Sequence, residues 1–209
     1  MLRSLEVLDR LRAIAIPFVV IGGWAVYLFT HYHMSRDLDL IMEQKDLWKL
    51  KSFVISQGGT EKAPGLSKYG YKLGQVDMDV YTEEKGDIIP SPGEILSGKR
   101  FVDVERYRVV EPEVLLLLKV RAATERAAGL KGLKDRCDVI SLLNSGRIDL
   151  NTFAAESRRH AQPNTVNEVL RIVEMADEEF EYVLGKRPTP QEKWRLKREL
   201  VRSLRRLEA

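Results

Sequence analysis

Four aspartates stand in two pairs along the chain, and their spacing suits the binding of a cation. Asp37 and Asp39 flank a leucine, and Asp77 and Asp79 flank a methionine. Successive side chains of a β-strand point to opposite faces, so residues two apart leave the same face. Neighbouring carboxylates repel each other unless a cation lies between them, and Mg²⁺ prefers oxygen ligands that it shares with substrate phosphates. The pattern predicts a site for metal-assisted phosphoryl or nucleotidyl transfer.

A glycine pair precedes the first aspartate pair, with thirteen residues between Gly23 and Asp37. Gly22 and Gly23 follow a short apolar run, residues 18–21, which is typical of a buried strand that ends in a tight turn. Residues 24–31 then favour a helix. Glycine lets the backbone approach a ligand closely, and a helix N-terminus presents unpaired N–H groups. We therefore expect this turn to receive phosphate.

These residues together resemble the nucleotidyltransferase superfamily, whose signature is a glycine pair, an Asp-x-Asp strand and a later third acid. The matching segments are Gly22-Gly23-Trp24-Ala25, Arg36-Asp37-Leu38-Asp39-Leu40 and Val76-Asp77-Met78-Asp79-Val80-Tyr81-Thr82. The chain is most similar to the minimal members, which include aminoglycoside- and lincosamide-resistance enzymes and abortive-infection or toxin–antitoxin enzymes. Residues 116–122 and 134–143 are similar to the helical segment after the core in those families. The resemblance covers roughly residues 16–145.

The resemblance implies a specific activity and a role for each acid. A nucleoside triphosphate would bind with Mg²⁺ or Mn²⁺, and a nucleoside monophosphate would pass to a hydroxyl of a small molecule, a protein or a tRNA. Asp37 and Asp39 would be metal ligands. The third carboxylate would be Asp79 or Asp77, and the family pattern favours Asp79. Nucleotide binding would fall to Gly22, Gly23 and Arg36.

Basic residues of the later helices are further candidates for contact with the triphosphate, as in this family. Lys119 is flanked by apolar residues, so its ammonium needs a nearby anion or an exit to water. Binding and structural roles are equally favoured for Lys119. For Lys134, a structural pair with Asp135 is favoured over triphosphate binding. His31 and His33 favour a surface loop.

The predicted elements alternate in the first half of the chain and are helical in the second. Helices are predicted over 2–14, 24–31, 45–56, 114–128, 134–143, 150–159, 165–184 and 190–207. Strands are predicted over 18–21, 37–41, 69–73, 76–81, 99–104 and 107–110, and residues 86–98 are predicted to be a loop. This pattern predicts an α+β fold. A nucleotidyltransferase-like mixed sheet with flanking helices would occupy residues 1–111, and a helical C-terminal part residues 112–209.

Composition restricts the classes of protein to which the chain can belong. The charged fraction is 31% and the net charge +3, so the whole chain is not a polybasic nucleic-acid binder. The single cysteine, Cys137, excludes an intrachain disulfide and zinc sites built on cysteine pairs. The longest apolar runs, 13–23 and 114–118, are too short to span a bilayer. We expect a cytoplasmic protein without a membrane partner.

Two alternatives to the enzyme follow from the same sequence. The first is a binding module of the same fold, such as one component of a toxin–antitoxin pair. The second is an RNA-binding protein that uses the basic amphipathic helix 190–207. Glu192 and Glu199 dilute the charge of that helix, so a solvated face is favoured there. The acceptor, the nucleotide and the oligomeric state stay open.

Overall fold

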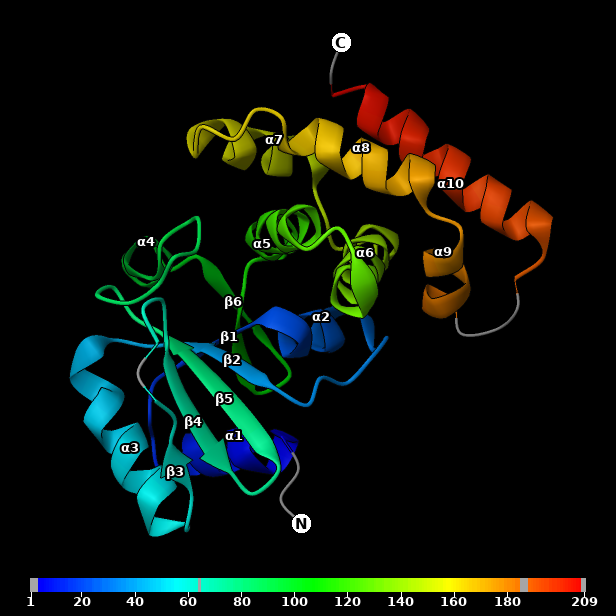
Figure 1. The fold of residues 1–209 in the computed structure, drawn as a ribbon. Helices are drawn as coiled ribbons and strands as arrows, with labels where there is room; N and C mark the ends of the chain where they lie inside the picture. Colours follow the sequence, from blue (N-terminus) through cyan, green and yellow to red (C-terminus); the bar gives the residue numbers. More distant parts are fainter. Residues whose placement is uncertain (1–3, 64, 185–187, 208–209) are drawn as a thin grey trace. The chain divides into compact units, whose positions relative to one another are not determined.

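The computed structural model describes residues 4–63, 65–184 and 188–207, and its backbone forms two compact units (Figure 1). Unit 1 is Met1–Glu111 and contains a sheet with helices around it. Unit 2 is Pro112–Ala209, and its described residues form helices only. None of the described helices combines the length and apolar character that a membrane span needs.

The described part of unit 1 is built on a seven-stranded mixed sheet in the order β3-β4-β5-β2-β1-β7-β6. The strands are β1 (Val19–Ile21), β2 (Leu38–Ile41), β3 (Thr60–Glu61), β4 (Tyr69–Leu73), β5 (Val76–Tyr81), β6 (Phe101–Val104) and β7 (Tyr107–Val110). The helices are α1 (Ser4–Ala13), α2 (Gly22–Thr30), α3 (Leu47–Ser56) and α4 (Pro92–Ser97), with a 3₁₀ turn η1 (Gln44–Asp46) before α3. The mixed sheet with flanking helices confirms the predicted fold class.

Strand pairing brings distant segments together at the centre of the sheet. β1 pairs with β2 in antiparallel and with β7 in parallel, and β2 pairs with β5 in parallel. Along β5 the apolar residues Val76, Met78 and Val80 are buried, whereas Asp77 and Asp79 are only half-buried. This alternation fixes the register, because a slip of one residue would bury the acids.

Unit 1 differs from the prediction in its connecting segments. Residues 86–98, predicted as a loop, contain α4, which begins at a capping box between Ser91 and Glu94 with Pro92 in the first turn. This signal is readable from sequence, but the surrounding glycines and prolines obscured it. The two-residue strand β3 was not predicted either.

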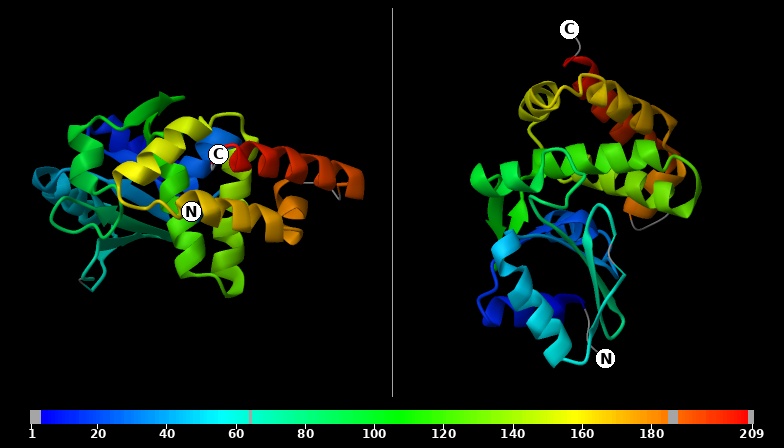
Figure 2. Two further views of the ribbon diagram at one scale, coloured as in Figure 1. Left: turned by 90° about the horizontal axis from the view of Figure 1, so that it is seen from above. Right: turned by 60° about the vertical axis from the view of Figure 1, so that its left-hand side comes forward.

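Unit 2 contains α5 (Pro112–Glu125), α6 (Gly129–Asn144), α7 (Leu150–Arg159), α8 (Thr165–Met175), α9 (Glu178–Val183) and α10 (Pro190–Arg205). Helix α10 runs alongside α8 (Figure 2). The single helix predicted over 165–184 is wrong, because the backbone is extended at Ala176 and a new helix begins after Asp177. Neither glycine nor proline marks this break. The contact that fixes the new helix comes from a residue distant in sequence, because Arg136 binds Glu179 at 2.6 Å and so anchors α9 to α6.

Candidate active site

An acidic row crosses the middle of the sheet in unit 1. In the parallel pairing of β2 with β5, Asp39 stands directly beside Asp79. The row continues to Gly70 on β4 and to Ile21 at the end of β1. Directly opposed residues share a face of the sheet. The sheet therefore places two predicted site acids, from segments forty residues apart, next to each other.

Gly22 brings the start of α2 against this row. Its φ is +66°, and a Cβ built on it would lie 2.1 Å from an Oδ atom of Asp39. A side chain here would meet both the strain of the left-handed region and a steric clash. Residue 22 must therefore be glycine if the backbone is to lie against the Asp39 carboxyl group.

The N-terminus of α2 has the character of an anion site. Its N-cap residue, Ile21, makes no side-chain hydrogen bond to the first turn, and that turn contains no acidic residue. The first N–H groups of a helix have no intrahelical partner and carry partial positive charge. This helix end can receive phosphate oxygens beside the acids.

The two acids of β5 pair with lysines from the segment that precedes β4. Lys68 forms an ion pair with Asp79, and the Lys62 ammonium lies 2.8 Å from a carboxylate oxygen of Asp77. Gly70 leaves room for the stem of Lys62, because a Cβ there would lie 3.0 Å from it. Sequence reasoning missed both lysines, although the predicted 69–73 and 76–81 hairpin already placed residue 68 near the acidic strand.

The charge of this cluster acts on the pKa of Lys62. Partial burial lowers the pKa of its ammonium, but the hydrogen bond to Asp77 and the neighbouring carboxylates outweigh that effect, so the net pKa is raised. The carboxylates concerned are those of Asp77, Asp79 and Asp37. Three of the four predicted acids therefore act on one lysine, which indicates that the loop before β2 and strand β5 share one negative field.

The donor set fits a hard divalent cation that completes its coordination with substrate. Among the described residues, no three His, Cys, Asp or Glu side chains converge into a metal-binding group. Mg²⁺ does not need such a cage, because it is commonly held by one or two carboxylates together with phosphates and water. Asp39, which is half-buried on β2, supplies such a carboxylate beside the α2 N-terminus, and Asp37 is exposed directly before β2.

The remaining predicted residues of unit 1 flank the acids. Gly23 is buried in the first turn of α2. Arg36 is exposed directly before Asp37, and its backbone carbonyl accepts a hydrogen bond of 2.9 Å from the Ser4 hydroxyl. This bond ties the entrance of β2 to α1. His31 and His33 are exposed, as expected for a surface loop.

The predicted Lys119 of unit 2 lies in an ionic cluster between α5 and α6, and Lys134 stands next to Asp135 in the sequence of α6. The Lys119 ammonium is 2.6 Å from Asp138 and 3.8 Å from Asp135, and all three side chains are buried. Arg126 approaches Asp135 to 3.1 Å. Burial raises the pKa of Asp135, against the opposing charges of Lys119, Arg126 and, more weakly, Lys134. Lys119 thus has the nearby anion that its apolar flanks require, and unit 2 itself provides it.

The sequence matches no protein-family model and no curated protein, whereas solved structures resemble the fold. A crystal structure of ANT(2″)-Ia in complex with adenylyl-2″-tobramycin is similar at a TM-score of 0.55 and 13% identity, over 75% of this chain and 94% of that one. An antigenic nucleotidyltransferase-like protein from Paracoccidioides brasiliensis gives 0.51 and 15%, over 86% and 89%. JHP933 from Helicobacter pylori gives 0.51 and 16%, over 99% and 97%. The chain has a nucleotidyltransferase fold.

Proposed function

We propose that this chain is a Mg²⁺-dependent nucleotidyltransferase that transfers a nucleoside monophosphate from a nucleoside triphosphate to an acceptor hydroxyl. The observation that carries the proposal is the contact of the Gly22 backbone with the Asp39 carboxyl group, with Asp79 beside it on β5. An uncapped helix end and adjacent acids are what a phosphate and its cation require. The fold of ANT(2″)-Ia, seen with an adenylylated aminoglycoside, is consistent with this activity.

The residues divide into those that hold the donor and those that receive a proton. Phosphate oxygens would bind at the N–H groups that open α2, and Asp37 and Asp39 would hold the cation. When bound, the cation would offset the negative charge of the phosphates and of the departing pyrophosphate. Arg36, which is exposed next to Asp37, would add a positive charge for the phosphates.

We assign the action on the acceptor to Asp79, which lies beside Asp39 in the sheet. Its carboxylate would take the proton of the acceptor hydroxyl while the hydroxyl oxygen bonds to the α-phosphorus. The bond from that phosphorus to the bridging oxygen breaks, and pyrophosphate leaves with the electron pair. Lys68 balances the charge of Asp79 when no substrate is present. Asp77, paired with Lys62, would remain outside the reaction.

The test combines nucleotide binding with turnover. Each of ATP, CTP, GTP and UTP is titrated with Mg²⁺, and pyrophosphate release is followed with aminoglycosides, a cell-protein extract or a tRNA pool as acceptor. Asp39→Asn keeps the side-chain volume but removes a charged ligand. We expect it to lower the rate about 1,000-fold, which corresponds to about 4 kcal/mol of transition-state stabilisation.

The matched control is Asp103→Asn, which makes the same change on the exposed surface of β6. Its activity and the melting temperatures of both variants should equal those of the wild type. Full turnover in the Asp39→Asn protein would refute the role of Asp39. Failure of the wild type to bind any nucleotide would refute the proposed function as a whole.

A further inference from the structure

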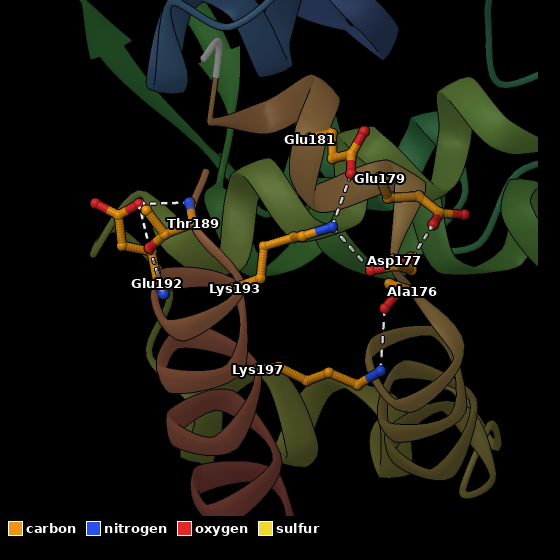
Figure 3. Close-up of polar contacts among 8 residues, drawn as sticks. All are labelled: Ala176, Asp177, Glu179, Glu181, Thr189, Glu192, Lys193 and Lys197. Atoms are coloured by element: carbon orange, nitrogen blue, oxygen red, sulfur yellow. Dashed lines mark hydrogen bonds and ion pairs between the residues drawn. The ribbon is translucent and has the colours of Figure 1, made fainter. Parts of the chain in front are cut away.

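One face of helix α10 contacts the rest of unit 2 through lysine side chains (Figure 3). The Lys193 ammonium lies 3.0 Å from Asp177 and 2.7 Å from Glu181, and Lys197 donates a 3.0 Å hydrogen bond to the carbonyl of Ala176. Farther along the same face, Leu204 is fully buried. These lysines bridge α10 to the junction of α8 and α9, so their charges are already used inside the protein.

The opposite face of α10 carries arginines that form no ion pair with the described residues. Arg198, Arg202 and Arg206 are exposed, and within residues 188–207 and the rest of the described chain none of them contacts a carboxylate. They recur every four residues, so they follow one side of the helix at intervals of about 6 Å. By contrast, the neighbouring arginines on this face are paired, Arg195 with Glu199 and Arg205 with Glu174.

A large aromatic side chain stands at the beginning of this row. Trp194 is 61% exposed, and the Arg198 guanidinium lies 4.8 Å from its ring centroid. Exposure of a tryptophan is costly in water unless a partner covers it, and a fixed ring beside a guanidinium offers two planar surfaces. Planar ligands with negative charge suit such a pair.

We propose that the outer face of α10, formed by Trp194, Arg198, Arg202 and Arg206, binds a single-stranded segment of RNA. The arginines contact successive phosphates, and one base stacks on Trp194. The row of cations is complementary to a polyanion, and the exposed ring offers a surface on which an unpaired base can stack, which a duplex does not present. Loops and ends of folded RNA are where unstacked bases are commonly bound by aromatic and arginine side chains.

The test measures binding of a fluorescein-labelled 15-nucleotide RNA without secondary structure to the full-length protein, by fluorescence anisotropy over a range of salt concentrations. The variant R198Q/R202Q/R206Q should bind at least tenfold more weakly. The slope of the logarithm of its binding constant against the logarithm of the salt concentration should become less steep by about 2, because each phosphate contact to a single strand contributes about 0.7 to that slope. Each single arginine variant should make this slope less steep by about 0.7. Trp194→Ala should weaken binding at least fivefold without changing the salt dependence.

The control variant K131Q/R147Q/R158Q removes the same charge from exposed positions elsewhere in unit 2. It should bind within twofold of the wild type. Equal weakening in both triple variants would show general charge attraction and overturn the proposal. Equal affinity for duplex RNA or for single-stranded DNA of the same sequence would overturn the assignment to single-stranded RNA. The nucleotidyltransferase assay with a non-RNA acceptor should be unaffected by these variants, so the two proposals fail separately.

Discussion

Both units contain lysine–aspartate pairs, but the pairs differ in their access to solvent. In unit 1 the side chains of Lys62 and Asp77 are each 38% exposed. In unit 2 the side chains of Lys119 and Asp138 are 10% and 3% exposed. An exposed pair contributes about 0–1 kcal/mol and opens easily, whereas removal of one partner from a buried pair leaves an uncompensated charge. Of these two pairs, only Lys62 with Asp77 can exchange the lysine for a ligand at small cost.

The largest effect that this comparison predicts is for Lys119→Met. The methionine leaves Asp138 buried without its cation, so the free energy of unfolding should fall by about 3–5 kcal/mol. Urea denaturation followed by circular dichroism measures it, with Lys131→Met on the exposed side of α6 as control. A stable variant that no longer binds nucleotide would instead favour the triphosphate role expected for Lys119.

The second prediction separates backbone strain from site geometry at Gly22. Gly22→Ala should lower the free energy of unfolding by about 2 kcal/mol and should also abolish nucleotide binding, because its Cβ would displace Asp39. Gly74→Ala is the matched control, since Gly74 has a φ of +62° but nothing within 4 Å of the added Cβ. The control should lose only about 1 kcal/mol and keep full binding. Normal binding in the Gly22→Ala protein would contradict the assigned contact.

The third prediction concerns the pH dependence of the buried cluster. Burial raises the folded-state pKa of Asp135 above its ordinary 3.8. Well below pH 3.8 this carboxyl is protonated in both the folded and the unfolded state. As the pH rises, the unfolded state releases the proton more readily, so the folded state loses stability until the pH has passed the raised pKa. Asp135→Asn should therefore gain stability relative to the wild type as the pH rises from 3.5 to 7. Urea denaturation at both pH values measures this, and a loss would mean that the pairing with Lys119 outweighs burial.

The smallest effect is expected at the half-buried pair of Lys68 with Asp79. Lys68→Gln removes a cation from Asp79, so Mn²⁺ should bind a few-fold more tightly, while the free energy of unfolding changes by less than about 1 kcal/mol. Electron paramagnetic resonance of free Mn²⁺ and thermal melting give the two readings. Lys51→Gln, which breaks an exposed pair with Glu61, is the control and should leave Mn²⁺ affinity unchanged. Weaker Mn²⁺ binding in Lys68→Gln would contradict competition between lysine and metal.

The sequence predicted those elements that a local pattern determines, but not those contacts that depend on residues distant in the chain. Alternation around Asp39 and Asp79 predicted their strands, and Gly22 predicted the turn into α2. The parallel register that sets those two acids side by side depends on pairing between segments far apart, which no local pattern encodes. Likewise, the break at Ala176 carries no local signal, since Arg136 and Lys197 hold it from other helices. The roles of the site residues remain predictions.

The parallel pairing of β2 with β5 also has a consequence for how the protein folds. The hairpin β4–β5 can form from contiguous chain, but it carries Asp79 without Asp39. The two acids meet only when β2 docks on that hairpin. This contact joins segments about forty residues apart, so it costs loop-closure entropy, and it also brings like charges together. A partly folded chain that contains the hairpin alone has Asp79 without Asp39, so the pair of adjacent acids is complete only after β2 has docked.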